Sequence, residues 1–327
     1  MNQRDKIRGA FVGLAIGDAL GAPVEFGFNS QDIISLGDKI EHFSDSIRLP
    51  KGVWTDDTEM ALCLADSLIE KQGYDSYDVM ERYYRWIHEG YRTYDGNPAS
   101  DVGIQTNRAI DLFRDNPVIH DGDLTESAGN GPIMRLAPAI IANTENTLEN
   151  TLDIAKYSCF ETHNSIGAMA TTELMAAALR LLINGEDKTK VLEQAIQSVK
   201  DPDLKDFLDR EDHLHNRIFD KTGNTIRDLG GYILDGFDIA MWGLINFGDF
   251  KSGLLGIIRL GGDTDTNGAI YGQLAGAYYG LEKIPNEWKN EVYRYNELIE
   301  IADKLYDLKT CKVLKTRFEN DKYFKMP

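Results

Sequence analysis

Two short acidic segments, far apart in the chain, constrain most strongly how this sequence can fold. One reads WTDDTE at Trp54–Glu59 and the other reads GGDTDTNG at Gly261–Gly268. Each combines two aspartates with threonine hydroxyls directly ahead of an apolar helical stretch. About two hundred residues separate them, so only the fold can bring them together. If they meet, four carboxylates converge, and these repel one another strongly unless cations lie between them.

The chemistry of these segments favours hard divalent cations. Carboxylate and hydroxyl oxygens are the ligands of Mg²⁺ or Mn²⁺, and two such ions would balance four carboxylates. The alternative is that both segments are helix N-caps, because Thr and Asp are preferred there. One segment alone favours capping, whereas two of them favour a metal centre. Neighbouring side chains fan around a helix, so Asp56 and Asp57 share a site only if the chain is still a loop there.

The composition excludes several classes of protein. The 327 residues carry 35 basic and 53 acidic side chains, a net charge of −18, which opposes binding to nucleic acid or to an anionic membrane. No apolar stretch is typical of a membrane span or a secretory signal. The three cysteines, Cys63, Cys159 and Cys311, have neither disulfide nor thiolate-metal spacing. We therefore expect a cytoplasmic protein.

Apolar residues recur at helical spacing through most of the chain, and proline is sparse at nine. We predict an all-α protein, with helices beginning near Asp5 and at the first acidic segment, and further helices over roughly 76–89, 103–113, 133–142, 147–158, 165–184, 188–199, 230–246, 251–259, 265–280 and 287–306. No Pro-, Ser- or Gly-rich linker divides the chain, so one compact domain over 1–327 is expected. The charged segment 201–228 has weak periodicity, which favours a solvated surface excursion over a partner contact.

Glycines recur every fourth residue inside two of the predicted helices, at Gly13 and Gly17 and at Gly268, Gly272 and Gly276. Each costs roughly 1 kcal/mol relative to alanine in a helix interior, so a bare helix face needs a structural reason. Close helix–helix packing is that reason. It would press together two helices that adjoin the acidic segments.

Other polar residues could serve the same site, although each also has a structural interpretation. Asp18 and Glu25 flank a Gly/Pro turn, where Asp18 could brace the turn and Glu25 could act as a general base beside a metal. Asp101 could cap the following helix or take part in the chemistry. His163 lies in a polar loop ahead of a long helix, and Tyr232 could be a core aromatic or a pocket wall.

The segment GNGPIMR, at residues 129–135, precedes an apolar helix. A glycine-rich segment before a helix offers free backbone N–H groups to a phosphate, although a turn plus a cap explains it equally well.

These segments, in this order, resemble the ADP-ribosylglycohydrolase family. The resemblance spans roughly residues 6–282 and leaves a C-terminal helical extension over 283–327; it rests on GAFVGLAIGDALGAPVEF, WTDDTEMAL, DVGIQT, GNGPIMRLAP, THNS, GGYILDGFDIAMWGL and GGDTDTNGAIYGQLAGAYYG. It implies an all-α fold around two Mg²⁺ or Mn²⁺ ions. The implied metal ligands are Thr55, Asp56, Asp57, Asp263, Asp265 and Thr266.

The resemblance also implies where an ADP-ribose group binds. The phosphates would lie on Gly129, Asn130, Gly131, Pro132, Ile133 and Met134, and His163 would line the ribose and pyrophosphate region. Pro132 stands where members often carry a small residue, so one N–H donor is missing there. Asp101 matches the acidic residue that arginine-specific bacterial members place beside the scissile bond, and Glu25 matches a glutamate near the metals. Tyr232 resembles an aromatic residue near the acceptor side chain.

From this resemblance we expect a metal-dependent hydrolase that releases ADP-ribose from a modified protein side chain, with arginine favoured. Asp101 or Glu25 would be the base or the acid. The alternatives are hydrolysis of serine-linked or O-acetyl-linked ADP-ribose, and a binder or immunity protein that acts against an ADP-ribosyltransferase. A degenerate binder would be expected to lose metal ligands, and none is missing here.

Overall fold

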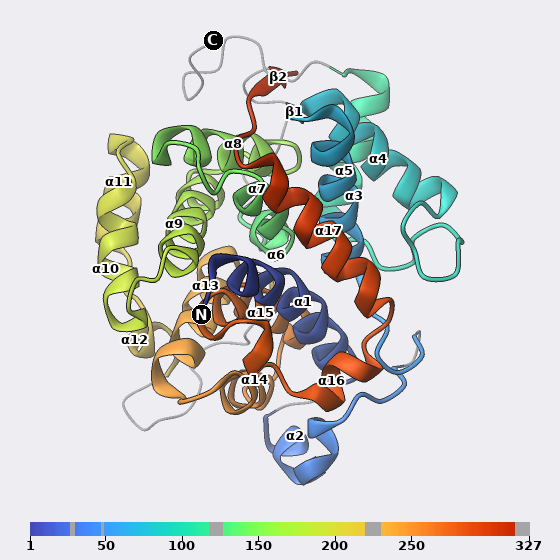
Figure 1. Cartoon of the computed structure of the whole chain (residues 1–327), viewed down its shortest axis with the longest axis vertical. Helices are drawn as coiled ribbons and strands as arrows, with labels where there is room; N and C mark the ends of the chain where they lie inside the picture. The colour runs from blue at the N-terminus through green and yellow to red at the C-terminus, as the bar shows by residue number, and fades with distance from the viewer. Residues whose placement is uncertain (27–29, 47–48, 118–126, 220–229, 318–327) are drawn as a thin grey trace.

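The computed structural model describes residues 1–327 except 27–29, 47–48, 118–126, 220–229 and 318–327 (Figure 1). Within those ranges the regular secondary structure is almost entirely helical, as the sequence predicted. The α-helices are α1 (Gln3–Gly21), α2 (Ser30–Leu36), α3 (Asp56–Lys71), α4 (Ser76–Glu89), α5 (Ile104–Asp115), α6 (Gly131–Met134), α7 (Ala137–Ile141), α8 (Leu148–Phe160), α9 (Ile166–Ile183), α10 (Lys188–Ser198), α11 (Pro202–Arg210), α12 (His215–Ile218), α13 (Ile233–Asn246), α14 (Phe250–Ile258), α15 (Thr264–Tyr279), α16 (Asn286–Glu291) and α17 (Tyr295–Leu308). Short 3₁₀ turns cover Ala22–Val24, Gly37–Glu41 and Leu281–Lys283.

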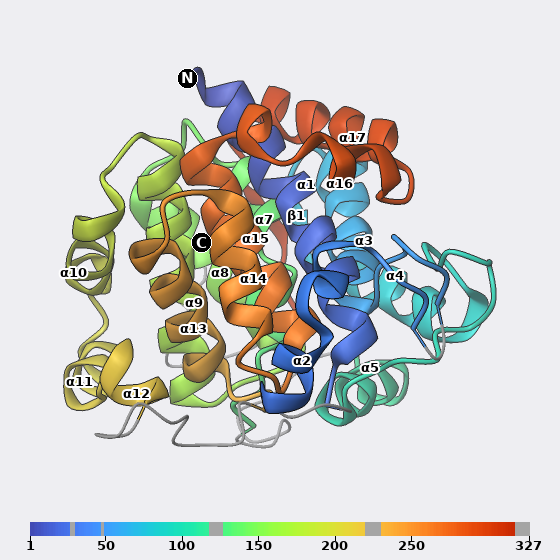
Figure 2. The same cartoon turned by 90° about the horizontal axis from the view of Figure 1, so that it is seen from below.

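Helices α1 and α15 lie side by side at the centre of the molecule, and their glycines form the contact (Figures 1 and 2). A Cβ on Gly13 would lie 2.3 Å from the Gly272 carbonyl oxygen, and one on Gly17 would lie 1.9 Å from that of Gly268. Gly276 meets Gly9 in the same way. The backbones therefore touch directly, and the predicted bare faces are confirmed. Any side chain at these positions would force the helices apart.

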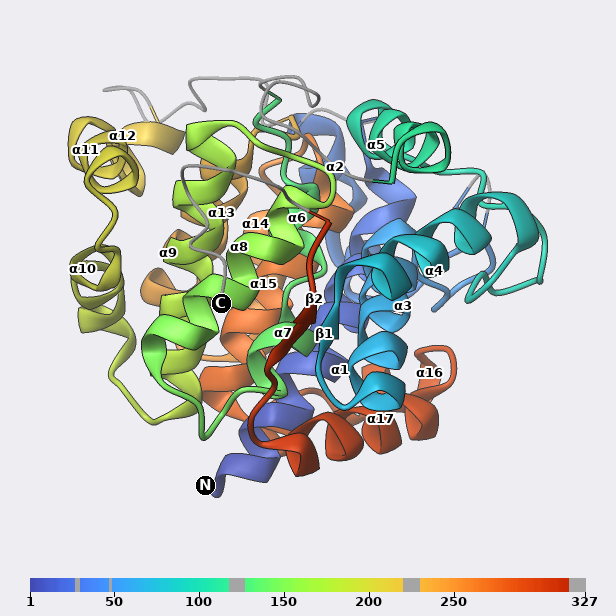
Figure 3. The same ribbon diagram turned by 90° about the horizontal axis from the view of Figure 1, so that it is seen from above.

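The other helices surround this pair. Helix α13 packs on α15, while α17 crosses α1 and reaches α3 (Figures 1 and 3). Two segments, Gln3–Val24 and Ile166–Ile183, are long and apolar enough to cross a membrane by length and composition alone, but 83% of each window is buried inside the molecule. Such burial is what the central helices of a globular core show.

Two predicted helices are each broken in the structure. The stretch 133–142 divides into α6 and α7, and α7 carries Pro138 in its first turn, where proline needs no N–H partner. The stretch 287–306 divides into α16 and α17 at Arg294, whose φ of 49° is left-handed. Apolar periodicity continues through both breaks, so it could not reveal them.

Two further features were not predicted. Strand β1 (Tyr74–Asp75) pairs in parallel with β2 (Val313–Lys315), joining the end of α3 to the C-terminal segment (Figure 3). The charged segment 201–228 is not simply a solvated excursion, because α11 buries Leu204 and Leu208 and α12 buries Arg217. Residues 220–228 of that segment lie outside the described residues.

Candidate metal centre and substrate cleft

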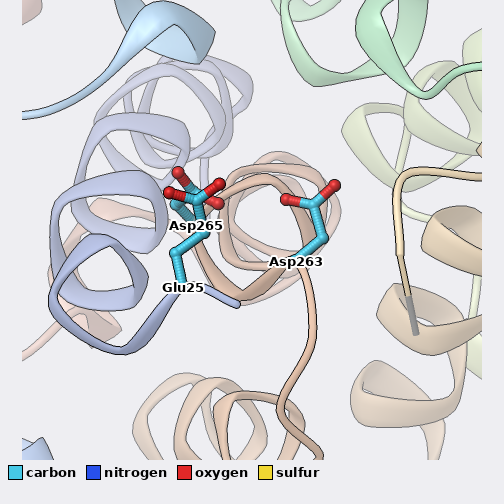
Figure 4. Close-up of side chains that lie close together, drawn as sticks. All are labelled: Glu25, Asp263 and Asp265. Carbon is cyan, nitrogen blue, oxygen red and sulfur yellow. The ribbon is translucent and has the colours of Figure 1, made fainter. Parts of the chain in front are cut away.

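The glycine contact between α1 and α15 ends at the second acidic segment. The Thr264 hydroxyl donates to the Gly21 carbonyl at 2.8 Å, and the Phe26 N–H donates to the Gly262 carbonyl at 2.9 Å. These bonds hold Glu25 over the first turn of α15. The carboxylates of Glu25 and Asp265 consequently lie beside each other with that of Asp263 facing them, one oxygen from each lying within 4.8 Å of the others (Figure 4).

Asp18, on α1, fixes the first acidic segment against the same place. Its side chain is fully buried and accepts from the backbone N–H groups of Thr55 (2.8 Å) and Thr58 (3.0 Å) and from both hydroxyls. Desolvation raises the pKa of Asp18 to about 6, against the lowering effect of these hydrogen bonds. Asp18 thus braces the start of α3, whereas the sequence analysis had assigned it to the Gly/Pro turn that follows α1.

The capping interpretation of the acidic segments is wrong for the described structure. Thr55 is the N-cap residue of α3 and Asp263 that of α15, yet neither side chain makes a capping hydrogen bond in the described chain. Asp18 supplies the cap of α3 instead, which frees the side chains of the segment itself. The sequence analysis expected Asp56 and Asp57 to share a site only if the chain were still a loop there. That expectation was also wrong, because both residues lie in the first turn of α3.

The Thr55 hydroxyl lies among three carboxylates. Its oxygen is 2.9 Å from Asp18 Oδ1, 3.0 Å from Asp57 Oδ2 and 3.4 Å from Asp265 Oδ2. A hydroxyl donates a single proton, so it can satisfy only one of three ionised oxygens at a time. Asp57 is completely buried, and its Oδ1 has no hydrogen-bond partner among the described residues. The donor set is rich in oxygen and lacks positive charge, which fits divalent cations.

The pKa values show the same imbalance. The pKa of Asp57 is well above its usual value because burial removes water and because Asp18, Asp56 and Asp263 repel its negative charge. Burial also raises the pKa of Asp265, with Asp263, Asp57 and Glu25 as the repelling neighbours. A cation among these oxygens would remove the repulsion and keep the carboxylates ionised.

A cleft opens beside Asp56, at the start of α3. It lies between the start of α3 and the loop that leads to α5, with an empty volume of about 590 Å³ that includes open solvent, and its walls include Trp54, Asp56, Glu59, Tyr94 and Asp101. The pKa of Asp56 is raised well above its usual value by burial, with Asp101 the strongest repelling neighbour. Asp101 therefore lies close to the acidic centre, in a cleft that favours a cationic group.

Glu59, in the wall of this cleft, was missed by the sequence reasoning. Its carboxylate accepts from the Trp86 indole N–H at 2.6 Å, and burial raises its pKa to about 8. The signal was present in WTDDTE, because Glu59 follows the second aspartate by two residues. A glutamate in the first turn of a helix is so common that it did not stand out.

The glycine-rich segment reaches the acidic centre through Asn130. The Asn130 side-chain amide donates to Asp263 Oδ2 at 2.7 Å, and its backbone N–H donates to the Gly231 carbonyl at 2.9 Å. Gly129 also forms an isolated antiparallel bridge with Tyr232. Gly231 has little room for a side chain, since a Cβ there would lie 3.3 Å from Asp263 Oδ2. The loop at 129–131 and the start of α13 therefore form one edge of the site.

The later residues of this segment serve the core. Pro132, Ile133 and Met134 are buried, and the carbonyls of Ile133 and Met134 accept from the Gln273 amide at 3.0 and 2.8 Å. Gln273 belongs to α15, so it ties the phosphate-binding candidate to the helix that carries Asp265. The buried side chains of Ile133 and Met134 pack in the core and so hold the loop in place.

His163 packs against the same loop and is 2% exposed. A Cβ on Gly129 would lie 2.9 Å from its Nε2, and one on Gly131 would lie 3.1 Å from its Cε1. Burial and the nearby positive charge of Arg135 lower the pKa of His163 to about 3, so the ring is neutral. Arg135, which donates to the Gly131 carbonyl, and Thr162, which contacts His163, are further residues that sequence reasoning did not identify.

Tyr232 is half-buried at the start of α13, where it packs against the hydrophobic core. The Arg217 guanidinium lies 5.2 Å from the centre of its ring, and a Cβ on Gly167 would lie 3.6 Å from its hydroxyl. Arg217 is held by an ion pair of 2.6 Å with Asp235. The charged segment therefore contacts the aromatic residue expected near the acceptor side chain.

Comparison with known proteins identifies this arrangement. A family model described as ADP-ribosylglycohydrolase matches residues 1–312. The chain belongs to the ADP-ribosylglycohydrolase family. The match passes residue 282 and includes α16 and α17, which the sequence analysis set apart as an extension. Membership and the named hydrolase relatives make this protein a glycohydrolase, with a substrate that carries ADP-ribose.

Several relatives cover nearly the whole glycohydrolase. The chain is 32% identical to the ADP-ribosylarginine hydrolase Tri1 of Pseudomonas putida (strain GB-1), covering 93% of this chain and 78% of that protein. It is 31% identical to the ADP-ribosyl-[dinitrogen reductase] glycohydrolase of Rhodospirillum rubrum, covering 88% and 90% respectively. A solved structure titled ADP-ribosylglycohydrolase-related protein complex superposes with a TM-score of 0.76 at 34% identity, covering 94% of this chain and 99% of that one.

Proposed function

We propose that this glycohydrolase releases ADP-ribose from modified arginine side chains and requires two divalent ions, Mg²⁺ or Mn²⁺. The main support is that carboxylates from the starts of two helices, far apart in the sequence, converge on the Thr55 hydroxyl. This place lies beside a cleft lined by Asp56 and Asp101. An arginine leaving group is cationic, and the acidic cleft complements it. The relatives named as ADP-ribosylarginine hydrolases support the same choice.

The ligands proposed for the ions are Thr55, Asp56, Asp57, Asp263, Asp265 and Thr266. They fit because Asp57 has a buried oxygen without a described partner and because Thr55 cannot satisfy all the carboxylates around it. Thr266 is 7% exposed and lies next to Asp265 in the first turn of α15. Divalent ions held by these residues would supply the positive charge that orients ribose hydroxyls and polarises an attacking water.

The protein's own residues would position the reactants. Asn130 is held by Asp263 and by the Gly231 carbonyl, so the loop at 129–131 presents a fixed edge to the pyrophosphate. Glu25, which overhangs the second acidic segment, would accept the proton of the attacking water. Asp101 would face the leaving guanidinium and stabilise its charge as the bond between ribose C1″ and nitrogen breaks.

A release assay tests this proposal. Proteins carrying arginine- or serine-linked ADP-ribose, and the small-molecule ester O-acetyl-ADP-ribose, would be incubated with the enzyme, with and without Mg²⁺ or Mn²⁺. We expect metal-dependent release from arginine, and a smaller effect of Asp101→Asn on the other two linkages than on arginine. Preferential release from serine or the acetyl ester would replace the proposed substrate. Release from none of the three would support a binder instead.

A further inference from the structure

The Thr162 hydroxyl bridges a buried arginine and the histidine beside the phosphate-binding loop. Its oxygen lies 2.7 Å from the Arg135 Nη2 and 2.8 Å from the His163 Nδ1. All three side chains are at most 2% exposed. The Gln105 amide donates to the Thr162 carbonyl at 2.8 Å, and the His163 N–H donates to the Cys159 carbonyl at 2.9 Å. The bridge is therefore built on a fixed backbone.

The chemistry of the partners sets the direction of each hydrogen bond. A guanidinium has donors and no acceptor, so the Thr162 oxygen must accept from Arg135. The hydroxyl keeps one proton to donate. Among the described residues, the only acceptor within hydrogen-bond distance of this proton is the Nδ1 of His163. If Nδ1 carried a proton instead, the hydroxyl proton would be buried without an acceptor.

An Nδ1 that accepts leaves the proton of a neutral imidazole on Nε2. The ring stays neutral across the physiological range, because burial and the charge of Arg135 lower the pKa of His163 to about 3. A neutral ring can still exchange its proton between Nδ1 and Nε2. The hydrogen bond from the Thr162 hydroxyl to Nδ1 prevents this exchange.

The Nε2 atom faces the floor of the proposed ADP-ribose site. It lies where a Cβ on Gly129 would be only 2.9 Å away, and it has no hydrogen-bond partner among the described residues. The same Arg135 that holds Thr162 also donates from Nη1 to the Gly131 carbonyl at 2.9 Å. One guanidinium thus fixes the loop and the histidine partner together.

We propose that Arg135 and Thr162 are positioning residues that hold His163 in the tautomer with its proton on Nε2, so that the ring offers a permanent hydrogen-bond donor to an oxygen of ADP-ribose lying on Gly129–Gly131. The identity of that ligand rests on the proposed function. The tautomer rests on the geometry alone. Gly129 is then required because a Cβ there would lie only 2.9 Å from the Nε2 donor, and a Cβ on Gly131 would crowd the same ring at Cε1, 3.1 Å away.

The test is nuclear magnetic resonance of the ¹⁵N-histidine-labelled full chain, with a long-range proton–nitrogen correlation that distinguishes the two neutral tautomers. His163→Gln identifies the signal among the six histidines. Wild type is expected to carry the proton on Nε2, and Thr162→Val, which keeps the shape without the hydroxyl, is expected to populate both tautomers. Thr162→Ser restores the hydroxyl and should restore the wild-type signal. A purely structural role would not produce this pattern.

Affinity for ADP-ribose, measured by calorimetry, completes the test. Thr162→Val should weaken binding by about 3- to 10-fold, the effect of one hydrogen bond, with Thr162→Ser close to wild type. Gly129→Ala should abolish most binding while leaving the Nε2 proton in place. A proton on Nδ1 in wild type, or an unchanged signal in Thr162→Val, would overturn the inference. If wild type shows the Nε2 proton yet binds no ADP-ribose, the proposed function fails and the tautomer assignment stands.

Discussion

The α1–α15 contact and the acidic centre at its end adjoin the same pair of helices, but close packing dominates the contact and electrostatic repulsion dominates the acidic centre. Along the contact, Gly13 and Gly17 carry no side chain, so the backbones of the two helices pack directly against each other. At the end, carboxylates from α3 and α15 crowd one threonine hydroxyl and repel one another. Close packing therefore stabilises the first region, whereas mutual repulsion of the carboxylates destabilises the second.

This difference shows how the fold serves the site. Packing along the glycines is favourable on folding and pays for the electrostatic repulsion at the end. The carboxylates raise one another's pKa values because their negative charges repel. This repulsion lowers the stability of the metal-free folded chain, and bound cations would remove it. We therefore expect substitutions in the two regions to act with opposite signs on stability.

The largest expected effect separates function from stability in the acidic centre. Asp265→Asn should lower metal-dependent release of ADP-ribose by at least about 100-fold, because it removes a proposed ligand. The same change should raise the melting temperature of the metal-free protein, since Asp263, Asp57 and Glu25 repel this carboxylate. Asp209→Asn, on the exposed surface of α11, is the control and should change neither quantity. Wild-type turnover in Asp265→Asn would show that the site is wrongly assigned.

The next largest effect tests the other region. Gly272→Ala places a Cβ 1.9 Å from the Gly13 carbonyl oxygen and should destabilise the protein by about 2 kcal/mol or more, despite the gain of roughly 1 kcal/mol from alanine in a helix. Chemical denaturation measures this. Gly248→Ala is the matched control, because a Cβ there meets nothing within 4 Å. Equal stability of the two variants would contradict direct backbone contact.

Adding metal should reverse the imbalance of the acidic centre. A saturating divalent ion at about one hundred times its Kd stabilises a protein by about 2.7 kcal/mol, so the melting temperature should rise with Mg²⁺ or Mn²⁺. Asp57→Asn, which loses the buried carboxylate next to Thr55, should show a much smaller rise. Gly248→Ala should respond as wild type does. A rise of the same size in Asp57→Asn would place the stabilising ion elsewhere.

The smallest effect is the pH dependence of the metal-free protein. Burial raises the pKa of Asp18 from 3.8 to about 6, and the pKa values of Asp57 and Asp265 also rise well above 3.8. The folded state then binds more protons than the unfolded chain in this window, so stability falls as the pH rises through it. Melting curves from about pH 4 to about pH 7 should show this fall, and bound metal should flatten it. Stability that rises over the same window would contradict the repulsion.

Much of this molecule could be predicted from its sequence because the decisive signals are local. Glycine at every fourth position indicated the bare helix faces, and aspartate beside threonine ahead of an apolar run indicated where α3 and α15 begin. The helix from 76 to 89 has the predicted bounds. The breaks between α6 and α7 and at Arg294 were missed, because hydrophobic spacing averages over single residues.

The contacts within the site could not be predicted, because they join side chains from separate helices. Asp18 caps α3 from α1, across 40 residues of chain to Thr58. Glu59 meets Trp86 of α4, and Arg135 meets Thr162 only after α6 and α8 have packed. No spacing rule reports such pairs. The ligand candidates were readable from the sequence, whereas the residues that hold them in place required the fold.

The most direct test of the central claim, that two distant acidic helix starts share divalent ions, is a crystal of this glycohydrolase grown with Mn²⁺ and measured at the manganese edge. The account predicts two anomalous peaks among Asp56, Asp57, Asp263 and Asp265, within reach of the Thr55 hydroxyl. A map without a peak among these carboxylates would contradict it.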